Sequence, residues 1–94
     1  MDLDALLGPS VFLKILDLFL ENPDEHMNMR AISRRIQKNP GSVHPILPKL
    51  VEKKILLAIQ VSAVSYVYSL NKESEYVKIL LEFFGRLKEQ TSAI

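Results

Sequence analysis

The spacing of the apolar residues changes twice along this chain of 94 residues, and this limits the folds that it can adopt. From Ser10 to Lys54, apolar residues recur every three or four positions, as they do on the buried faces of helices. From Ile55 to Leu70 they alternate with less apolar residues, as they do in strands. After Leu70 the helical spacing returns. The sequence therefore predicts a mainly α chain with a small β-hairpin (α+β).

Capping signals divide the first part of the chain into three helices. Ser10 suits the N-cap of a helix over about 10–22, and Asn28 suits the N-cap of a second helix near 29–37. Asn39 is followed directly by a proline, which is the pattern of an N-cap and a first helical residue. The third helix is therefore expected to begin at that point.

Two prolines interrupt the pattern of the third helix. Pro45 and Pro48 lie among the apolar residues Val43, Leu47 and Leu50, which share the spacing of one buried face. A proline inside a helix removes a hydrogen bond and clashes with the preceding turn, at a cost of about 3 kcal/mol or more. We therefore expect either that regular helix starts late, near Pro45, or that the segment is kinked.

The second part of the chain predicts a hairpin followed by a long helix. Strands over 55–61 and 66–70 flank a polar turn at 62–65, and the last helix covers about 75–90. This helix carries more apolar residues than one buried face requires, namely Tyr76, Val77, Ile79, Leu80, Leu81, Phe83, Phe84 and Leu87.

The net charge of +1 conceals a strong division along the chain. Residues 1–27 carry six acidic residues against one basic residue, whereas residues 28–60 carry seven basic residues against one acidic residue. Residues 61–94 are balanced. A basic block of this kind favours a surface that faces a polyanion, although a solvated helix face that happens to be basic is the alternative.

The composition excludes several kinds of site. There are no cysteines, which excludes disulfides, thiolate zinc sites and thiol redox chemistry. No apolar run approaches the ~20 residues that span a bilayer, and the acidic N-terminus is unlike an export signal. We therefore expect a cytoplasmic protein with a single domain over 1–94, made of a core of about 10–70 and a terminal helix of about 75–90.

The parts of an active site are also missing from the sequence. The two histidines, His26 and His44, lie in a predicted turn and on the third helix, and the three glycines are too scattered to form a phosphate-binding loop. We expect no catalytic residue, no metal and no cofactor. A zinc site shared across a dimer by His26 and Glu25 is the one metal-binding alternative.

Two segments of the basic block resemble the winged helix-turn-helix regulators of the ArsR, MarR and PadR type. They are residues 29–36, MRAISRRI, and residues 39–56, NPGSVHPILPKLVEKKIL. In that superfamily a small residue and a serine or threonine open the recognition helix, and Leu-x-x-Leu-Glu-Lys-x-Gly-Leu closes it. Here Lys54 stands where glycine is usual. The resemblance covers roughly residues 10–90 and implies a winged-helix fold with a C-terminal dimerisation helix.

The resemblance also implies a function, which is the binding of double-stranded DNA by a prokaryotic transcriptional regulator or a DNA-coating accessory factor. It implies that the third helix enters the major groove and that neighbouring residues grip phosphates. The candidate DNA-binding residues are Arg30, Arg34, Arg35, Lys38, Asn39, Ser42, His44, Lys49, Lys53 and Lys54. Because prolines occupy positions where related regulators carry side chains that hydrogen-bond to base edges, we expect weak base specificity.

The hairpin, which is the wing of the fold, departs from the pattern of many winged helices. Its tip, residues 62–65, carries no arginine or lysine, and no basic residue lies between Lys54 and Lys72. The wing therefore either touches only the DNA backbone or does not touch DNA. This observation favours the alternative function, a winged-helix module that binds partner proteins through the wing and does not bind DNA.

The surplus of apolar residues on the last helix predicts a homodimer, because it would otherwise leave an exposed patch. We expect this helix to pair with the N-terminal segment of a second copy, including Leu13 and Leu20. The alternative is that the N-terminal segment of the same chain covers the patch. The predicted interface consists of Leu3, Leu6, Leu7, Tyr76, Leu80, Phe83, Phe84 and Leu87.

Overall fold

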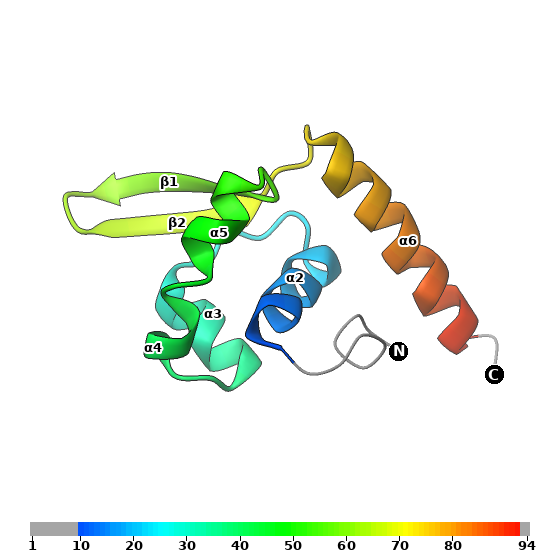
Figure 1. Ribbon diagram of the computed structural model, residues 1–94, viewed down its shortest axis with the longest axis horizontal. Helices are drawn as coiled ribbons and strands as arrows, with labels where there is room; N and C mark the ends of the chain where they lie inside the picture. The colour runs from blue at the N-terminus through cyan, green and yellow to red at the C-terminus, as the bar shows by residue number, and fades with distance from the viewer. Residues whose placement is uncertain (1–9, 93–94) are drawn as a thin grey trace.

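The structure is a computed structural model that describes residues 10–92, and it has the predicted order of helices followed by a hairpin and a final helix (Figure 1). The predicted interface residues Leu3, Leu6 and Leu7 lie outside the described residues. The elements are α2 (Val11–Glu21), α3 (Met29–Ile36), α4 (Pro40–Val43), α5 (Leu47–Glu52), β1 (Leu56–Ser62), β2 (Ser65–Leu70) and α6 (Glu75–Ser92). The predicted fold class is confirmed.

The three predicted helix caps are present. The side chain of Ser10 accepts a hydrogen bond from the backbone N–H of Leu13 over 2.9 Å, at the start of α2. Asn28 Oδ1 accepts from the N–H of Ala31 over 2.8 Å, at the start of α3. Asn39 is the N-cap of α4, whose first residue is the predicted proline. Each cap satisfies a backbone donor that has no partner inside its helix.

The predicted third helix is divided into α4 and α5. It does not start late, because Asn39 and Pro40 begin it as a cap and a first-turn proline. It breaks in the middle because Pro45 has no N–H to donate to the turn before it. The next donor, the N–H of Ile46, bonds over 3.0 Å to the carbonyl only three residues back, that of Val43. The interruption that the prolines predicted is therefore a break between two short helices.

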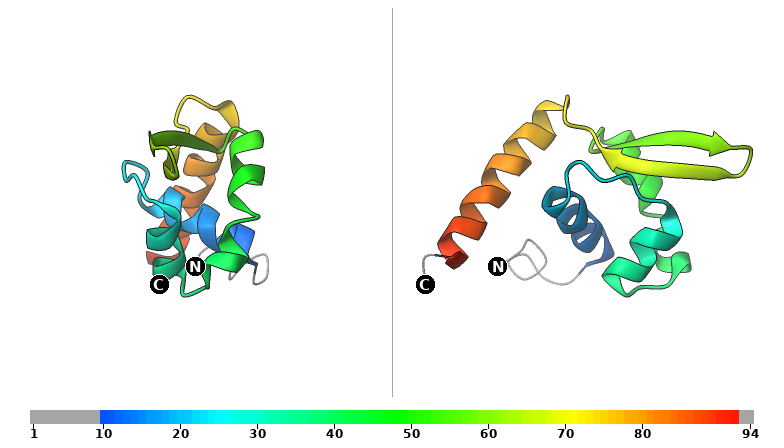
Figure 2. Two further views of the ribbon diagram at one scale, coloured as in Figure 1. Left: turned by 90° about the vertical axis from the view of Figure 1, so that its left-hand side faces the viewer. Right: turned by 180° about the vertical axis from the view of Figure 1, so that it is seen from behind.

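The core lies between α2 and the elements that surround it. Ile15 and Phe19 of α2 and Ile32 of α3 are fully buried. Leu20, which we expected to face a second copy, is only 3% exposed and lies in the same core, so that prediction is wrong. Helix α6 crosses beside α2, as Figures 1 and 2 show, and Lys88 bonds to a carboxylate oxygen of Glu21 on α2 over 3.4 Å.

The hairpin extends beyond the helices from a buried base (Figure 1). Strands β1 and β2 pair antiparallel from Leu56 opposite Leu70 to Ser62 opposite Ser65. On the other edge of β2, the backbone of Met27 exchanges two hydrogen bonds with that of Tyr68, over 2.9 and 2.8 Å. Strand β2 therefore lies between β1 and the segment that leads into α3.

A left-handed residue ends α5 and turns the chain into β1. Lys54 has a φ of 62°, and its N–H bonds to the carbonyl of Val51 over 2.9 Å. The N–H of Ile55 bonds to the carbonyl of Leu50 over 3.0 Å, which completes a Schellman cap. This is the position where the regulators that the sequence resembles have glycine, and the backbone conformation explains that preference because glycine adopts positive φ without a steric penalty.

We predict that Lys54→Gly raises the free energy of unfolding by about 1 kcal/mol. A non-glycine residue in the left-handed region costs on the order of 1–3 kcal/mol, which glycine relieves. Glycine also increases the conformational entropy of the unfolded chain, and this offsets about 0.5–1 kcal/mol of the stabilisation. Urea denaturation measures the change. The matched control is Lys53→Gly, which removes the same charge at a φ of −78° and should lower the free energy of unfolding. Destabilisation by both variants would contradict the prediction.

Candidate nucleic-acid interface

Three of the candidate basic residues lie close together where α3 meets α4. Arg30, Arg34 and Lys38 line one shallow hollow together with Ser33 and Pro40. All three basic side chains are exposed, and none of them forms an ion pair with another residue within 10–92. Unpaired cations beside the first turn of a helix form a surface that can accept phosphate groups. We call these three residues the α3 basic cluster.

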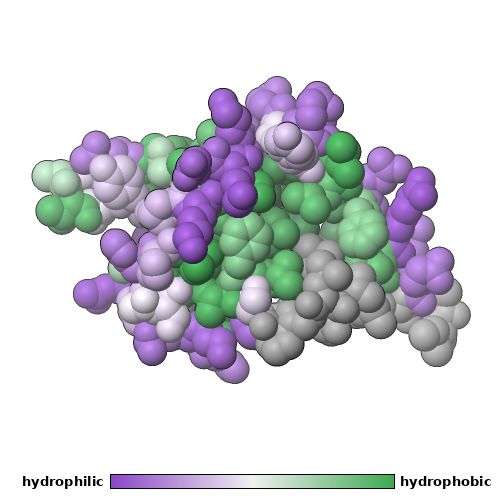
Figure 3. All heavy atoms as spheres, in the orientation of Figure 1, coloured by the Kyte–Doolittle hydropathy of each residue, from purple (hydrophilic) through white to green (hydrophobic). Residues whose placement is uncertain are grey.

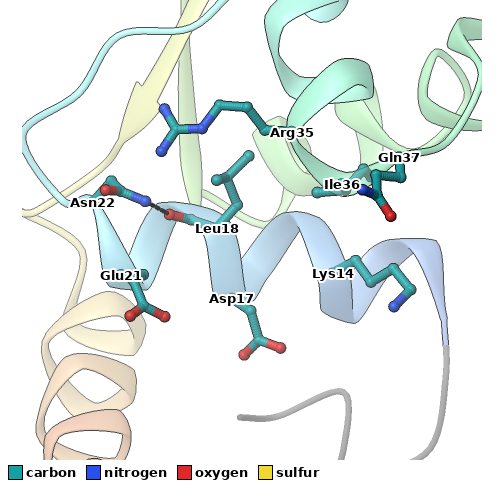
Figure 4. A pocket seen from close by; sticks show the side chains of 8 residues that line it. All are labelled: Lys14, Asp17, Leu18, Glu21, Asn22, Arg35, Ile36 and Gln37. Atoms are coloured by element: carbon teal, nitrogen blue, oxygen red, sulfur yellow. Dashed lines mark hydrogen bonds between the residues drawn. The ribbon is translucent and has the colours of Figure 1, made fainter.

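Arg35 lies on a different side of α3 from this cluster. Its guanidinium forms an ion pair with Glu25 and a 3.5 Å contact with Met27 Sδ. Figure 4 shows the side chain extending over α2 toward Asn22, where it lines a groove between α2 and α3. The sequence predicts that Arg34 and Arg35 both point outward from this helix, but neighbouring residues on a helix point about 100° apart. Its acidic partner was not detectable from helix spacing.

Three acidic residues that precede the basic block, Glu21, Asp24 and Glu25, also form ion pairs. Asp24 pairs with Lys72. The hydrogen bond from Lys72 and its charge hold the pKa of Asp24 below its usual value. Glu21 pairs with Lys88 and Glu25 with Arg35, so these three carboxylates pair with residues outside the α3 basic cluster.

The polar residues at the start of α4 bond mainly to one another. Asn39 Oδ1 accepts from both the N–H and the hydroxyl of Ser42, over 3.0 and 3.3 Å. His44 is exposed in the break between α4 and α5, and Lys49 is exposed on α5. The outer side of the broken helix therefore presents one imidazole and one ammonium group beside the exposed rings of two prolines.

Lys53 and Lys54 lie at the other end of α5, beside α6. They line an apolar groove of about 540 Å³ together with Ile55, Tyr76 and Ile79. Figure 3 shows hydrophobic side chains gathered between α5 and α6 in this region. The two lysines are thus separated from the α3 basic cluster by the length of the broken helix. The ten candidate residues do not form one continuous patch.

Arg30, one of the predicted DNA-binding residues, also lies next to the wing, a position that the sequence did not predict. It lines a small hollow with Met29 of α3 and with Val64, Ser65 and Tyr66 of the hairpin. The wing itself has no arginine or lysine, but its tip lies near the first turn of α3. The pairing of Met27 with β2 brings these two parts together, and that pairing has no distinct sequence signal.

The hairpin face toward α5 carries two tyrosines. Tyr66 and Tyr68 line a hollow against Pro48 and Val51 of α5. Burial raises the pKa of the Tyr68 hydroxyl above its ordinary value, and Tyr66 adds to the effect. The Tyr68 phenol is therefore neutral at physiological pH and carries no charge toward a nucleic acid.

The outer face of α6 is apolar and exposed. Tyr76, Ile79 and Phe83 are 69%, 64% and 43% exposed, whereas Phe84 is only 3% exposed. Phe84, which we expected at the dimer interface, lies seven residues after the fully buried Val77 and therefore shares its inward face. We call Tyr76, Ile79 and Phe83 the α6 apolar patch. Leu80 and Leu87 are half-buried at its border with the core.

Within residues 10–92, no group of three or more histidine, cysteine, aspartate or glutamate side chains is placed to hold a metal ion. In the same part of the chain, no helix combines the length and the apolar character that crossing a membrane requires.

No protein-family model and no curated protein sequence matches the chain. Several solved structures do. Reduced HlyU from Vibrio cholerae aligns with a TM-score of 0.64 at 22% identity, over 90% of this chain and 82% of its own. A possible transcriptional regulator from Methanosarcina mazei aligns with a TM-score of 0.63 at 24% identity, over 95% and 81% of the two chains.

The ferric uptake regulator from Francisella tularensis, solved with iron, aligns with a TM-score of 0.64 at 18% identity. The match covers 70% of this chain but only 54% of that regulator, so this chain spans about half of its length. These similarities show the winged helix-turn-helix fold of transcriptional regulators. The resemblance inferred from the two sequence segments is thereby confirmed at the level of the fold.

Proposed function

We propose that this chain is a winged-helix DNA-binding protein, either a prokaryotic transcriptional regulator or a DNA-coating accessory factor, that grips phosphates with modest base specificity. The observation that carries the proposal is the α3 basic cluster. Arg30, Arg34 and Lys38 form no ion pair within the described part of the chain and converge beside the first turn of α4. In the winged-helix fold, this is the side of the molecule that faces the DNA backbone.

Modest base specificity follows from the broken helix. Direct readout in the major groove requires donors and acceptors that reach base edges, and arginine, lysine, asparagine and glutamine provide them best. The exposed residues between Gly41 and Lys49 include two prolines, which have no donor, and His44. Most of the binding energy would then come from phosphate contacts, which carry no sequence information directly.

A homodimer is the second part of the proposal. The α6 apolar patch is a set of large exposed side chains on one helix face, and a second copy of α6 offers the same surface in a two-fold arrangement. Such a dimer presents two copies of the broken helix, which can occupy successive major grooves about 34 Å apart. The groove between α5 and α6 borders the same patch and would be partly covered.

The alternative function, a module that binds proteins and not DNA, is supported by the wing. Val64 at the tip is 90% exposed, and the hairpin around it carries no charged residue. Fluorescence anisotropy with a random duplex of roughly 30 base pairs separates the two functions. Micromolar binding that weakens steeply with salt supports the DNA-binding function. An absence of binding at low salt would favour the alternative.

We predict that Arg34→Ala weakens DNA binding and that Arg35→Ala does so much less. Loss of one charged hydrogen bond of about 1.5 kcal/mol should weaken binding about tenfold. The slope of log K against log salt should fall by about 0.9, the value for one phosphate contact. The adjacent Arg35 is the matched control, because its replacement removes the same charge from a side chain that Glu25 already engages. Equal effects of the two variants would contradict the assignment of the α3 basic cluster.

We predict that Ile79→Asp converts the protein from a dimer to a folded monomer. A carboxylate inside an apolar interface is costly, whereas in the monomer this position is open to water. At low micromolar concentration, light scattering coupled to size exclusion should give about twice 10.7 kDa for the original protein and 10.7 kDa for the variant. Val64→Asp, an equivalent change on the wing, is the control that should stay dimeric. A monomeric original protein at micromolar concentration would refute the dimer.

A further inference from the structure

Strand β1 has one edge without a partner among the described residues. One edge of β1 pairs with β2. The other edge of β2 pairs with Met27, which bonds to Tyr68. The sheet therefore ends at β1, which extends away from the helices with the hairpin (Figure 1). An open edge presents a row of backbone donors and acceptors that can pair with another strand.

The open edge is also apolar. Leu57 and Ile59 lie on one face of β1, opposite Ser69 and Val67 of β2, and they are 45% and 44% exposed. Every residue between Lys54 and Lys72 is uncharged. Edge strands of proteins that stay apart commonly carry lysine or another charge, which blocks pairing. A bulge between Gln60 and Ser62 disturbs only the end of β1 near the tip.

A second copy of the same strand is the occupant that this edge fits. If two copies of β1 pair antiparallel about a two-fold axis through Ala58, Leu57 of each copy lies opposite Ile59 of the other. On the other face Leu56 lies opposite Gln60, so that each pair in this register is uncharged. A strand without charged residues has no electrostatic preference for an acidic or a basic partner. In this register, its own apolar side chains pair with those of a second copy.

We propose that β1 pairs edge to edge with β1 of a neighbouring copy and that this contact joins dimers side by side along DNA. The second half of the proposal rests on the proposed function. The α6 apolar patch and the β1 edge belong to different elements, so each chain would have two separate two-fold contacts. Two such contacts on one chain link copies into an open row, because each dimer keeps a free edge at both ends.

Binding to duplexes of two lengths tests the contact. The short duplex holds one dimer and the long duplex holds several. We expect the original protein to bind the long duplex cooperatively, with about tenfold coupling between neighbours. Ile59→Lys should abolish the cooperativity and keep binding to the short duplex. Val64→Lys adds the same charge at the tip, away from the edge pairing, and should keep the cooperativity. Any general increase in DNA affinity from the added positive charge is the same in both variants, so it does not explain a difference in cooperativity.

Sedimentation velocity without DNA tests the contact separately from DNA binding. We expect the original protein to form species larger than a dimer as its concentration rises, and Ile59→Lys to stop at the dimer. Ile79→Asp lacks the α6 contact and is a monomer at low micromolar concentration. At much higher concentration we expect it to pair through β1, and adding Ile59→Lys should remove that pairing. If circular dichroism shows that Ile59→Lys does not fold, Leu57→Lys, at the other exposed position of the pair, replaces it.

The possible failures are distinguishable. Non-cooperative binding by the original protein, together with the absence of any species larger than a dimer, would overturn the β1 contact and leave the DNA-binding function intact. Failure of every variant to bind either duplex would overturn the proposed function, whereas sedimentation would still decide whether the β1 edges pair.

Discussion

Burial of one apolar face of α2 is the interaction on which the rest of the structure depends. Ile15 and Phe19 are fully excluded from water, and α3, β2 and α6 all pack around this helix. A chain of this size buries only ~60–65% of its unfolded surface, so it has no second core to place these elements. The position of α6 beside α2 decides which of its apolar residues turn inward. The α6 apolar patch is what this arrangement leaves outside.

The local features of the fold could be predicted because they depend on a few adjacent residues. Ser10, Asn28 and Asn39 mark helix starts through bonds made within three positions, and Pro45 interrupts a helix through its own missing N–H. The features that could not be predicted depend on distant partners. Helical spacing shows that α6 has surplus apolar residues, but only its packing against α2 shows that Phe84 is inside and Tyr76 outside.

The same distinction applies to the candidate DNA-binding residues. The sequence identified a basic block, and the structure divides it by what lies nearby. Glu25 comes from the turn before α3 and pairs with Arg35, whereas Arg30, Arg34 and Lys38 have no acidic partner among residues 10–92 and converge. Charge along the sequence therefore predicts where basic residues are concentrated but not how they are grouped on the surface, because the grouping depends on which acidic side chains the tertiary structure brings to each basic residue.

The weak base readout that we propose and the surplus apolar surface fit a single mode of action. Under the proposed function, the two prolines that break the helix into α4 and α5 limit how much one subunit can discriminate between DNA sequences. Affinity for DNA can instead be gained by linking subunits, because a second contact made by an already bound neighbour is effectively intramolecular. The α6 apolar patch and the uncharged edge of β1 are surfaces through which such linking can occur. In this arrangement, the wing contributes to DNA binding through protein contacts, which is consistent with its lack of basic residues.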